Sequence, residues 1–242
     1  MTNLGRALRT SAVAQAAEIA FVFLVAAAVV SVGWTLVGDD ALGRQAVVWV
    51  ANVLMLITIW IGLRLRGQTW EHFGLRLRWG GRRALGRTVL QSIIVCVLAL
   101  TAFVVGTVAM KDVAAAPAGA DMSGYDYLQG NLPLLLLALA AVYVVSSFGE
   151  EMLYRGFLIS RLAEIGKAGR VAWGIAAGTS AVTFGLAHFD WGIVGVVQTA
   201  FMGLVLAISY LVTQRNLWAL VLAHAYIDTV LLVQMYTGVA AP

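Results

Sequence analysis

Charged side chains are scarce in this chain, and their scarcity excludes an ordinary soluble protein. Only 12% of the 242 residues are Asp, Glu, Lys or Arg, whereas soluble domains carry about 25%. Hydrophobic residues make up 61% of the sequence, proline occurs three times and glycine 25 times. This balance is typical of transmembrane helices that pack through small residues. The composition predicts one all-α polytopic membrane domain over residues 1–242.

Cysteine and histidine are also sparse, which limits the available chemistry. The single cysteine, Cys96, lies in an apolar run and has no partner for an internal disulfide or a cysteine-based metal site. We interpret Cys96 as a packing residue rather than a nucleophile. Of the three histidines, His72 lies in an arginine-rich segment, where we expect an interfacial side chain. His188 and His224 fall in apolar runs and need another explanation.

Apolar runs of about 18 to 25 residues are long enough to span a bilayer. Seven such runs can be distinguished: 12–37, 46–63, 88–109, 132–150, 171–189, 192–212 and 217–236. Residues 152–165 either continue the fourth run into the cytoplasm or form a separate short helix, so we expect a bundle of seven to eight transmembrane helices. A tight turn is expected at 166–169, where two glycines interrupt the apolar pattern. Glu18, inside the first run, is expected to snorkel to the interface.

The charge distribution predicts the orientation of the chain. The segment 64–87 contains seven arginines and one acid, and loops rich in Lys and Arg remain in the cytoplasm. We therefore expect a multi-pass protein of the cell's inner membrane with a cytoplasmic N-terminus. Aromatic side chains alternate with these arginines, which predicts contact with membrane lipids. The arginines cluster in the loops between apolar runs, as the positive-inside rule predicts, so no nucleic acid partner is expected, although the net charge is +4.

Ionisable side chains lie in apolar surroundings at three places in the C-terminal half. These are Glu150 with Glu151 and Arg155, His188 after Phe184, and His224 with Asp228. Charges at membrane depth are costly and usually have a function. Because buried polar groups need partners, we predict that the three places form one joint site.

Helical spacing supports the joint site. Glu150 precedes Gly169 by 19 residues and His188 follows it by 19, so the two would lie at one level of an antiparallel hairpin. Glu151 and Arg155, four residues apart, are expected to form an ion pair on one helix face. Glu150 would point elsewhere as an unpaired carboxylate, as required of a general acid or base. Glycines 174 and 178 are expected to admit a neighbouring backbone near this region.

Several functions are compatible with these residues. A glutamate and a histidine can activate water for attack on an amide or ester carbonyl, while a second histidine stabilises the oxyanion. Carboxylate and imidazole groups also bind zinc, for which Glu150, His188, His224 and Asp228 are candidates. The alternatives are a structural ion pair, a non-catalytic bacteriocin-immunity or scaffold protein, and a transporter that uses the carboxylates as a proton relay.

The three motifs together resemble those of a known protease family. Glu150-Glu151-x-x-x-Arg155, Phe184-x-x-x-His188 and His224-x-x-x-Asp228 are similar to the motifs of the CPBP (CAAX protease and bacteriocin-processing, or Abi) family, over residues 132–236. The resemblance implies an intramembrane endopeptidase of about eight helices with a cavity open to the cytoplasm. Such a hydrolase cleaves near the C-terminus of a membrane-associated protein or peptide. Prenylated CaaX proteins are the family's best-known substrates. Residues 1–131 carry no signature and would supply additional spans.

The resemblance also implies residue roles. Glu150 and His188 would activate water, His224 and its partner Asp228 would assist the oxyanion, and Glu151 with Arg155 would hold the helix. The family is described both as metalloprotease and as metal-free, so the cofactor is either none or a divalent metal such as zinc. The third motif commonly ends in asparagine, whereas this chain has Asp228. An ionised carboxylate cannot donate a hydrogen bond, so Asp228 would stay protonated, orient His224 or bind a metal.

Overall fold

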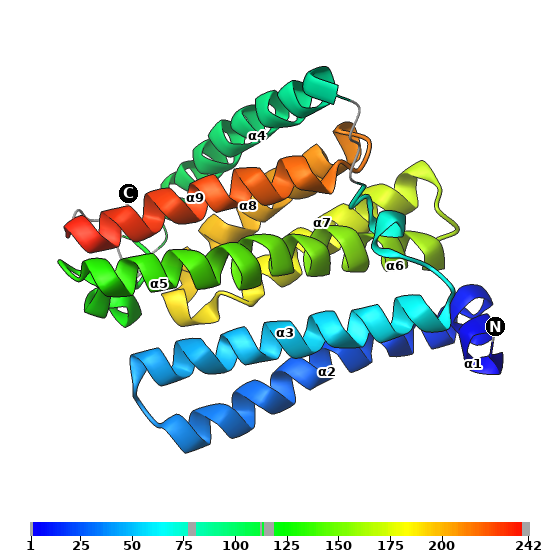
Figure 1. Cartoon of the computed structure of the whole chain (residues 1–242), viewed down its shortest axis with the longest axis horizontal. Coiled ribbons are helices and arrows are strands. Elements are labelled where there is room, and N and C mark those ends of the chain that lie inside the picture. Colours follow the sequence, from blue (N-terminus) through cyan, green and yellow to red (C-terminus); the bar gives the residue numbers. More distant parts are fainter. Residues whose placement is uncertain (1, 77–80, 112, 114–118, 239–242) are drawn as a thin grey trace.

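The computed structural model describes residues 2–76, 81–111, 113 and 119–238, and within these ranges every regular element is a helix (Figure 1). The elements are α1 (Asn3–Thr10), α2 (Ala12–Val37), α3 (Ala41–Leu65), η1 (Trp70–Phe73), α4 (Gly81–Met110), η2 (Ser123–Leu128), α5 (Leu132–Val142), η3 (Tyr143–Phe148), η4 (Glu151–Leu158), α6 (Ile159–Ile165), α7 (Arg170–Leu186), η5 (Phe189–Trp191), α8 (Gly192–Val212) and α9 (Leu217–Thr237). Arg78, part of the basic segment, lies outside the described residues.

The expected all-α membrane fold is confirmed. Six helical segments of the described chain are long and apolar enough to cross a membrane: 12–37, 41–65, 81–110, 132–165, 189–212 and 217–237. The fifth predicted run corresponds to α7, whose 17 residues make it shorter than the other six. Side-chain caps fix where several helices begin. Ser11 accepts a hydrogen bond from the Ala14 amide at the start of α2, and Asn131 accepts one from Leu134 at the start of α5.

The fourth predicted run continues through the ambiguous segment. α5, η3, η4 and α6 form one helical rod from Leu132 to Ile165, so residues 152–165 are not a separate helix. Both η3 and η4 have π-helical hydrogen bonding, which widens the helix and is frequent at functional sites. The chain then turns at Gly166–Gly169, as the glycine pattern predicted, and returns as α7.

Close helix packing uses different glycines from those expected. A Cβ atom at Gly106 would lie 2.7 Å from the Gln198 Cα, and one at Gly185 would lie 2.6 Å from the Val196 carbonyl oxygen. These glycines allow α4 and α7 to approach α8. Gly174 and Gly178 have no such neighbour within 4 Å. The expectation that they admit a neighbouring backbone is wrong, because the face of α7 that carries them meets no other helix in the described part of the chain.

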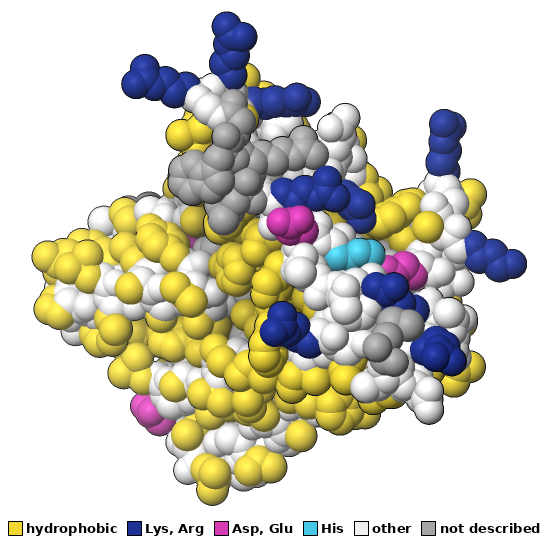
Figure 2. Space-filling view, turned by 45° about the vertical axis from the view of Figure 1, so that its right-hand side comes forward, with side chains coloured by type: hydrophobic (Ala, Val, Ile, Leu, Met, Phe, Trp, Pro, Cys, Tyr) yellow, Lys and Arg dark blue, Asp and Glu magenta, His cyan; other side chains and the backbone are white. Residues whose placement is uncertain are grey.

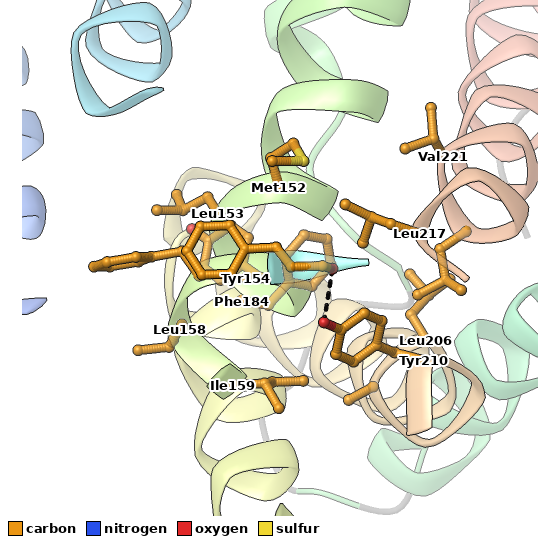
Figure 3. Close-up of a cluster of buried hydrophobic side chains, with 14 of the residues drawn as sticks. Met152, Leu153, Tyr154, Leu158, Ile159, Phe184, Leu206, Tyr210, Leu217 and Val221 are labelled. Carbon is orange, nitrogen blue, oxygen red and sulfur yellow. Dashed lines mark hydrogen bonds between the residues drawn. The ribbon is translucent and has the colours of Figure 1, made fainter. Parts of the chain in front are cut away.

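The buried core is centred on the rod and on α8 and α9 (Figure 3). Tyr154 packs edge-on against Phe184, with ring centroids 5.0 Å apart. Tyr210 of α8 donates a hydrogen bond of 2.8 Å to the Phe73 carbonyl oxygen. This bond fastens η1, which follows α3, to the core of the C-terminal half.

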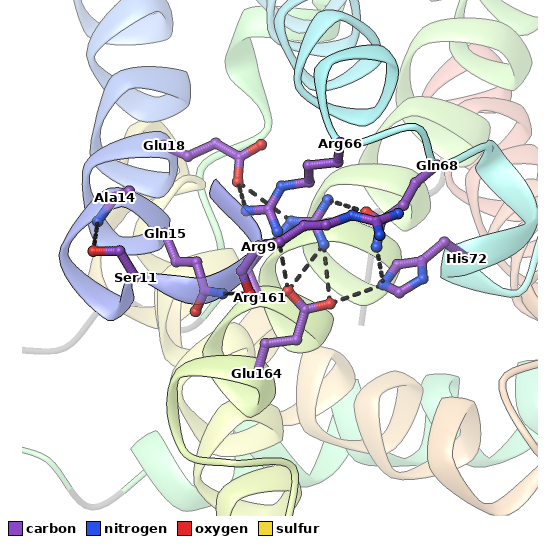
Figure 4. Close-up of polar contacts among 10 residues, drawn as sticks. All are labelled: Arg9, Ser11, Ala14, Gln15, Glu18, Arg66, Gln68, His72, Arg161 and Glu164. Atoms are coloured by element: carbon purple, nitrogen blue, oxygen red, sulfur yellow. Dashed lines mark hydrogen bonds and ion pairs between the residues drawn. The ribbon is translucent and has the colours of Figure 1, made fainter. Parts of the chain in front are cut away.

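A cluster of buried charges, which we call the charged cluster, joins α2 and the residue after α3 to α6 (Figure 4). It consists of Glu18, Arg66, His72, Arg161 and Glu164. Glu18 pairs with Arg66 and, at 3.4 Å, with Arg161, while Glu164 accepts from His72 at 2.8 Å. Glu18 therefore does not snorkel, because its side chain is only 8% exposed and two guanidinium groups neutralise it.

The two ends of the bundle differ in charge. The basic end carries the N-terminus, and Figure 2 shows Lys and Arg side chains gathered there. We define it by Arg6, Arg9, Arg64, Arg66, Arg76, Arg82, Arg83, Lys167, Arg170 and Arg215. The opposite end holds the α2–α3 turn, η2, η5 and the end of α9. Contacts between Trp34 and Phe189, and between Asp121 and Trp191, hold this end together.

Candidate active site

His224 of α9 lies at the centre of the predicted site. Its Nδ1 atom is 2.8 Å from Glu151 Oε1. Its Nε2 atom faces two further carboxylates, at 3.6 Å from Asp228 Oδ1 and 3.9 Å from Glu150 Oε2. Residues from η4, α9 and the junction between η3 and η4 therefore meet around one imidazole. A carboxylate only accepts, so Nδ1 carries a proton and donates it to Glu151.

Glu151 and Arg155 form the expected ion pair, behind the site rather than within its cavity. Arg155 Nη1 lies 2.8 Å from Glu151 Oε1, and both side chains are fully buried. The same guanidinium donates to the Gly203 carbonyl oxygen at 3.3 Å and lies over the Phe184 ring. Because Glu151 holds both Arg155 and His224, this pair fixes η4, α8 and α9 relative to one another. The sequence did not reveal the bond between Glu151 and His224.

Glu150 and Asp228 are the two carboxylates beside His224 that reach the cavity, with side chains 13% and 14% exposed. Each is held by a serine of η3. Ser146 Oγ donates to Glu150 Oε1 at 3.0 Å, and Ser147 Oγ donates to Asp228 Oδ2 at 2.6 Å. Sequence reasoning missed both serines. Their signal was a pair of hydroxyls in an apolar run, one helical turn before the glutamates.

His188 follows α7 and faces the same cavity. Its Nδ1 atom is 2.8 Å from the Phe184 carbonyl oxygen, which only accepts, so Nδ1 carries a proton and Nε2 is left as an acceptor. The ring packs between Phe184 and Trp191, with centroids 4.7 and 4.8 Å away. Within the described part of the chain, no hydrogen bond or ion pair joins His188 to Glu150, although both line the cavity.

The cavity has a volume of about 440 Å³ and lies between the α2–α3 hairpin and the C-terminal helices. Ser146, Glu150, His188, His224 and Asp228 supply the polar groups nearest the predicted site. Its walls are mainly apolar: Phe23, Ala26, Val30, Met55, Phe103, Ala138, Val142, Leu186, Met202, Leu231 and Leu232. Such a lining suits a largely apolar ligand that is positioned by a few polar groups.

The cavity extends toward the end opposite the N-terminus. Trp34, Gln45, Tyr125 and Asp190 line it at that end, and none of its described lining residues belongs to the basic end. The side of the membrane to which the cavity opens and the orientation of the N-terminus both stay predictions. Burial raises the pKa of the Tyr125 phenol above its ordinary value, so its hydroxyl remains protonated beside the cavity.

The donor atoms do not form a recognisable metal site. Among the described residues, no three His, Cys, Asp or Glu side chains are grouped closely enough to hold a metal ion. A protein zinc site needs three or four ligands at about 2 Å from the metal, and the bond from His224 Nδ1 to Glu151 leaves the Nε2 atom of that ring as the one available for such a role. Metal dependence stays a prediction.

Comparison with known families supports the resemblance drawn from the motifs. Residues 132–230 match the family model described as "Type II CAAX prenyl endopeptidase Rce1-like". Searches of curated proteins and of solved structures found no match. The matched range contains all six predicted site residues. It supports a CAAX-type intramembrane protease in general and leaves the individual catalytic roles as predictions.

Proposed function

We propose that this chain, whose residues 132–230 match the model of the Rce1-like family of type II CAAX prenyl endopeptidases, uses Glu150 and His188 to activate water for peptide hydrolysis. The supporting observation is that Glu150 and His188 line one cavity while remaining unbonded to each other. Glu151, by contrast, is fully buried and engaged by Arg155 and His224. Of the two adjacent acids, Glu150 is thus the one available to a substrate.

Water activation follows from the free acceptors. Ser146 holds one oxygen of Glu150, while Glu150 Oε2 has no hydrogen-bond partner among the described residues. A water placed between Glu150 and His188 Nε2 donates a proton to the carboxylate as its oxygen attacks the peptide carbonyl. Glu150 then returns the proton to the departing amine, so that the carboxylate is regenerated and one water is consumed.

Oxyanion stabilisation is assigned to His224. Its Nδ1–H is committed to Glu151, whereas its Nε2 atom is 3.6 Å from Asp228 and 3.9 Å from Glu150, beyond ordinary hydrogen-bond length. When the ring is protonated, Nε2–H can therefore donate to the carbonyl oxygen as negative charge develops there. Asp228, held by Ser147, keeps the imidazole oriented and needs no donor of its own.

The proposed substrate is the C-terminal region of a membrane-associated protein or peptide. The apolar walls of the cavity suit an extended apolar chain. A prenylated CaaX-type tail is one such chain, and the family match makes it the first substrate to test. The proposed location is the inner membrane, where both enzyme and substrate are embedded.

The test is cleavage by the full chain in phosphatidylglycerol–phosphatidylethanolamine liposomes. The substrates are quenched-fluorescent peptides with and without a farnesylated C-terminal cysteine. Glu150→Gln and His188→Asn should each lower turnover by about 10²- to 10⁴-fold, as expected for loss of a general base. Glu71→Gln, an exposed acid on η1, is the matched control and should retain turnover.

Two results would contradict the proposal. Full turnover by Glu150→Gln would remove this glutamate from the mechanism, and absence of cleavage of every peptide would favour a non-catalytic membrane protein. Chelation tests whether the enzyme needs a metal. Metal dependence would be established if 1,10-phenanthroline abolishes turnover, zinc restores it, and the protein is measured to bind the metal.

A further inference from the structure

A second cavity, which we call the basic-end cavity, lies away from the candidate active site. It has a volume of about 580 Å³ and is formed by the residues after η1, the first turns of α4 and the α8–α9 turn. Its lining residues are Gly74, Arg76, Gly81, Arg82, Ala84, Leu85, Arg87, Thr88, Gln91, Thr213, Gln214, Arg215, Asn216, Trp218 and Leu222. None of them lines the candidate active site, so the two cavities are separate.

The charge of the basic-end cavity is of one sign. Four arginines from three segments line it: Arg76, Arg82, Arg87 and Arg215. No Asp or Glu occurs among its described lining residues. Arg66 and Arg161 differ from these four, because carboxylates neutralise them in the charged cluster. An anion is therefore the complementary ligand for this cavity.

Part of the remaining lining is apolar and continues onto membrane-spanning helices. Leu85 belongs to α4, and Trp218 and Leu222 belong to the first turns of α9. The side chain of Leu85 is 65% exposed. The Trp218 indole N–H is buried and has no hydrogen-bond partner in the described part of the chain. Arginines beside an apolar wall at the end of a membrane span match the two chemical parts of a phospholipid.

The frame of the basic-end cavity is fixed before any ligand binds. The Asn216 amide donates to Thr88 Oγ1 at 3.1 Å and to Gln91 Oε1 at 2.9 Å, which joins the α8–α9 turn to α4. The Leu217 amide bonds to the Gly74 carbonyl oxygen, which joins the same turn to the segment after η1. A preformed site of this kind loses less entropy on binding.

We propose that the basic-end cavity binds a single anionic phospholipid, with its phosphate on the arginines and its acyl chain along Leu85, Trp218 and Leu222. The apolar wall favours a lipid over free phosphate, because inorganic phosphate would leave that wall unused. The position at the basic end places the site at the leaflet that attracts arginine-rich segments. Neither the family match nor the proposed proteolysis assigns a ligand here.

The experiment compares two double variants of the full chain that lose the same charge. Arg82→Gln/Arg87→Gln removes two cavity arginines. Arg64→Gln/Arg83→Gln removes two exposed arginines of the same end that do not line the cavity. Native mass spectrometry of the detergent-purified proteins, titrated with phosphatidylglycerol or phosphatidylcholine, measures the affinity of the first bound lipid.

The wild-type protein should bind phosphatidylglycerol in preference to phosphatidylcholine. The cavity variant should bind phosphatidylglycerol about 30-fold more weakly, which is the loss of affinity expected when two interfacial arginines are removed. The control variant should match the wild type. Equal loss in both variants would overturn the proposal in favour of diffuse surface attraction. Displacement of the lipid by excess inorganic phosphate would instead indicate a free-phosphate site. Thermal unfolding of each variant verifies folding, and single Arg82→Gln provides a milder second test.

Discussion

Replacing Glu150 by glutamine and replacing the adjacent Glu151 by glutamine should impair different properties of the protein. Glu151 is fully buried between the Arg155 guanidinium and the His224 ring. Glu150 lies in the cavity and accepts from Ser146. We therefore predict that Glu151→Gln loses stability, whereas Glu150→Gln loses turnover and keeps its stability.

The magnitudes follow from the burial of the groups left behind. In Glu151→Gln the guanidinium of Arg155 stays fully buried without a counter-charge, and breaking a buried pair costs about 3–5 kcal/mol. In Glu150→Gln the Ser146 hydroxyl can still donate to the amide oxygen, and the side chain is partly exposed. A change of that kind costs less than about 1 kcal/mol, while loss of the general base lowers turnover by about 10²- to 10⁴-fold.

Unfolding by SDS in mixed micelles, followed by tryptophan fluorescence, measures the first effect, and the liposome cleavage assay measures the second. A third variant, Glu151→Gln/Arg155→Met, removes both charges of the pair and should regain part of the lost stability, because the unpaired guanidinium is gone. Wild-type stability in Glu151→Gln, or equal destabilisation in Glu150→Gln, would refute the division of roles between the two acids.

Three further predictions concern other parts of the chain. Asp228→Asn should retain turnover within about tenfold, because Ser147 can still donate to the amide oxygen. A loss as large as that of Glu150→Gln in the cleavage assay would show that catalysis needs the negative charge of Asp228. Glu18→Gln should destabilise the protein by about 3 kcal/mol in SDS unfolding, since Arg66 and Arg161 are almost fully buried; wild-type stability would contradict the importance of the charged cluster. Gln45→Cys and Arg83→Cys, in a Cys96→Ser background, should react with a membrane-impermeant thiol reagent from opposite sides of the membrane, and labelling from one side would contradict the arrangement of the ends.

The helices were predictable because their signal is local. Span length, glycine turns and the four-residue spacing of Glu151 and Arg155 depend on helix geometry, which the sequence expresses directly. Counting residues on either side of the turn after Ile165 also predicted that Glu150 and His188 lie at the same height in the two helices, and both residues do line one cavity. Their catalytic roles stay predictions.

What the sequence could not supply depends on contacts between helices. The bond from Glu151 to His224 links η4 to α9 across 73 positions of the chain, and the Ser147–Asp228 bond spans 81. The exposed face of α7 at Gly174 and the close approach at Gly185 carry the same local pattern of small residues. Only the rotation of α7 about its axis distinguishes them, and packing of the whole bundle sets that rotation.

The position of the cavity bears on which substrates can reach it. Most of the described arginines and the N-terminus lie at the basic end, whereas Arg44 lies at the other end, toward which Trp34, Gln45 and Asp190 extend the cavity. If the basic end faces the cytoplasm, as its charge predicts, the cavity extends from Glu150 toward the other side of the membrane. The α2 and α3 residues of the cavity wall then make lateral entry from the lipid, between this hairpin and η3, the route that fits a lipid-embedded chain. Two measurements therefore bear on the route of the substrate. Labelling of the two cysteine variants reports which side of the membrane the cavity approaches. The comparison of farnesylated with unmodified peptides reports whether the substrate enters from the lipid or from water.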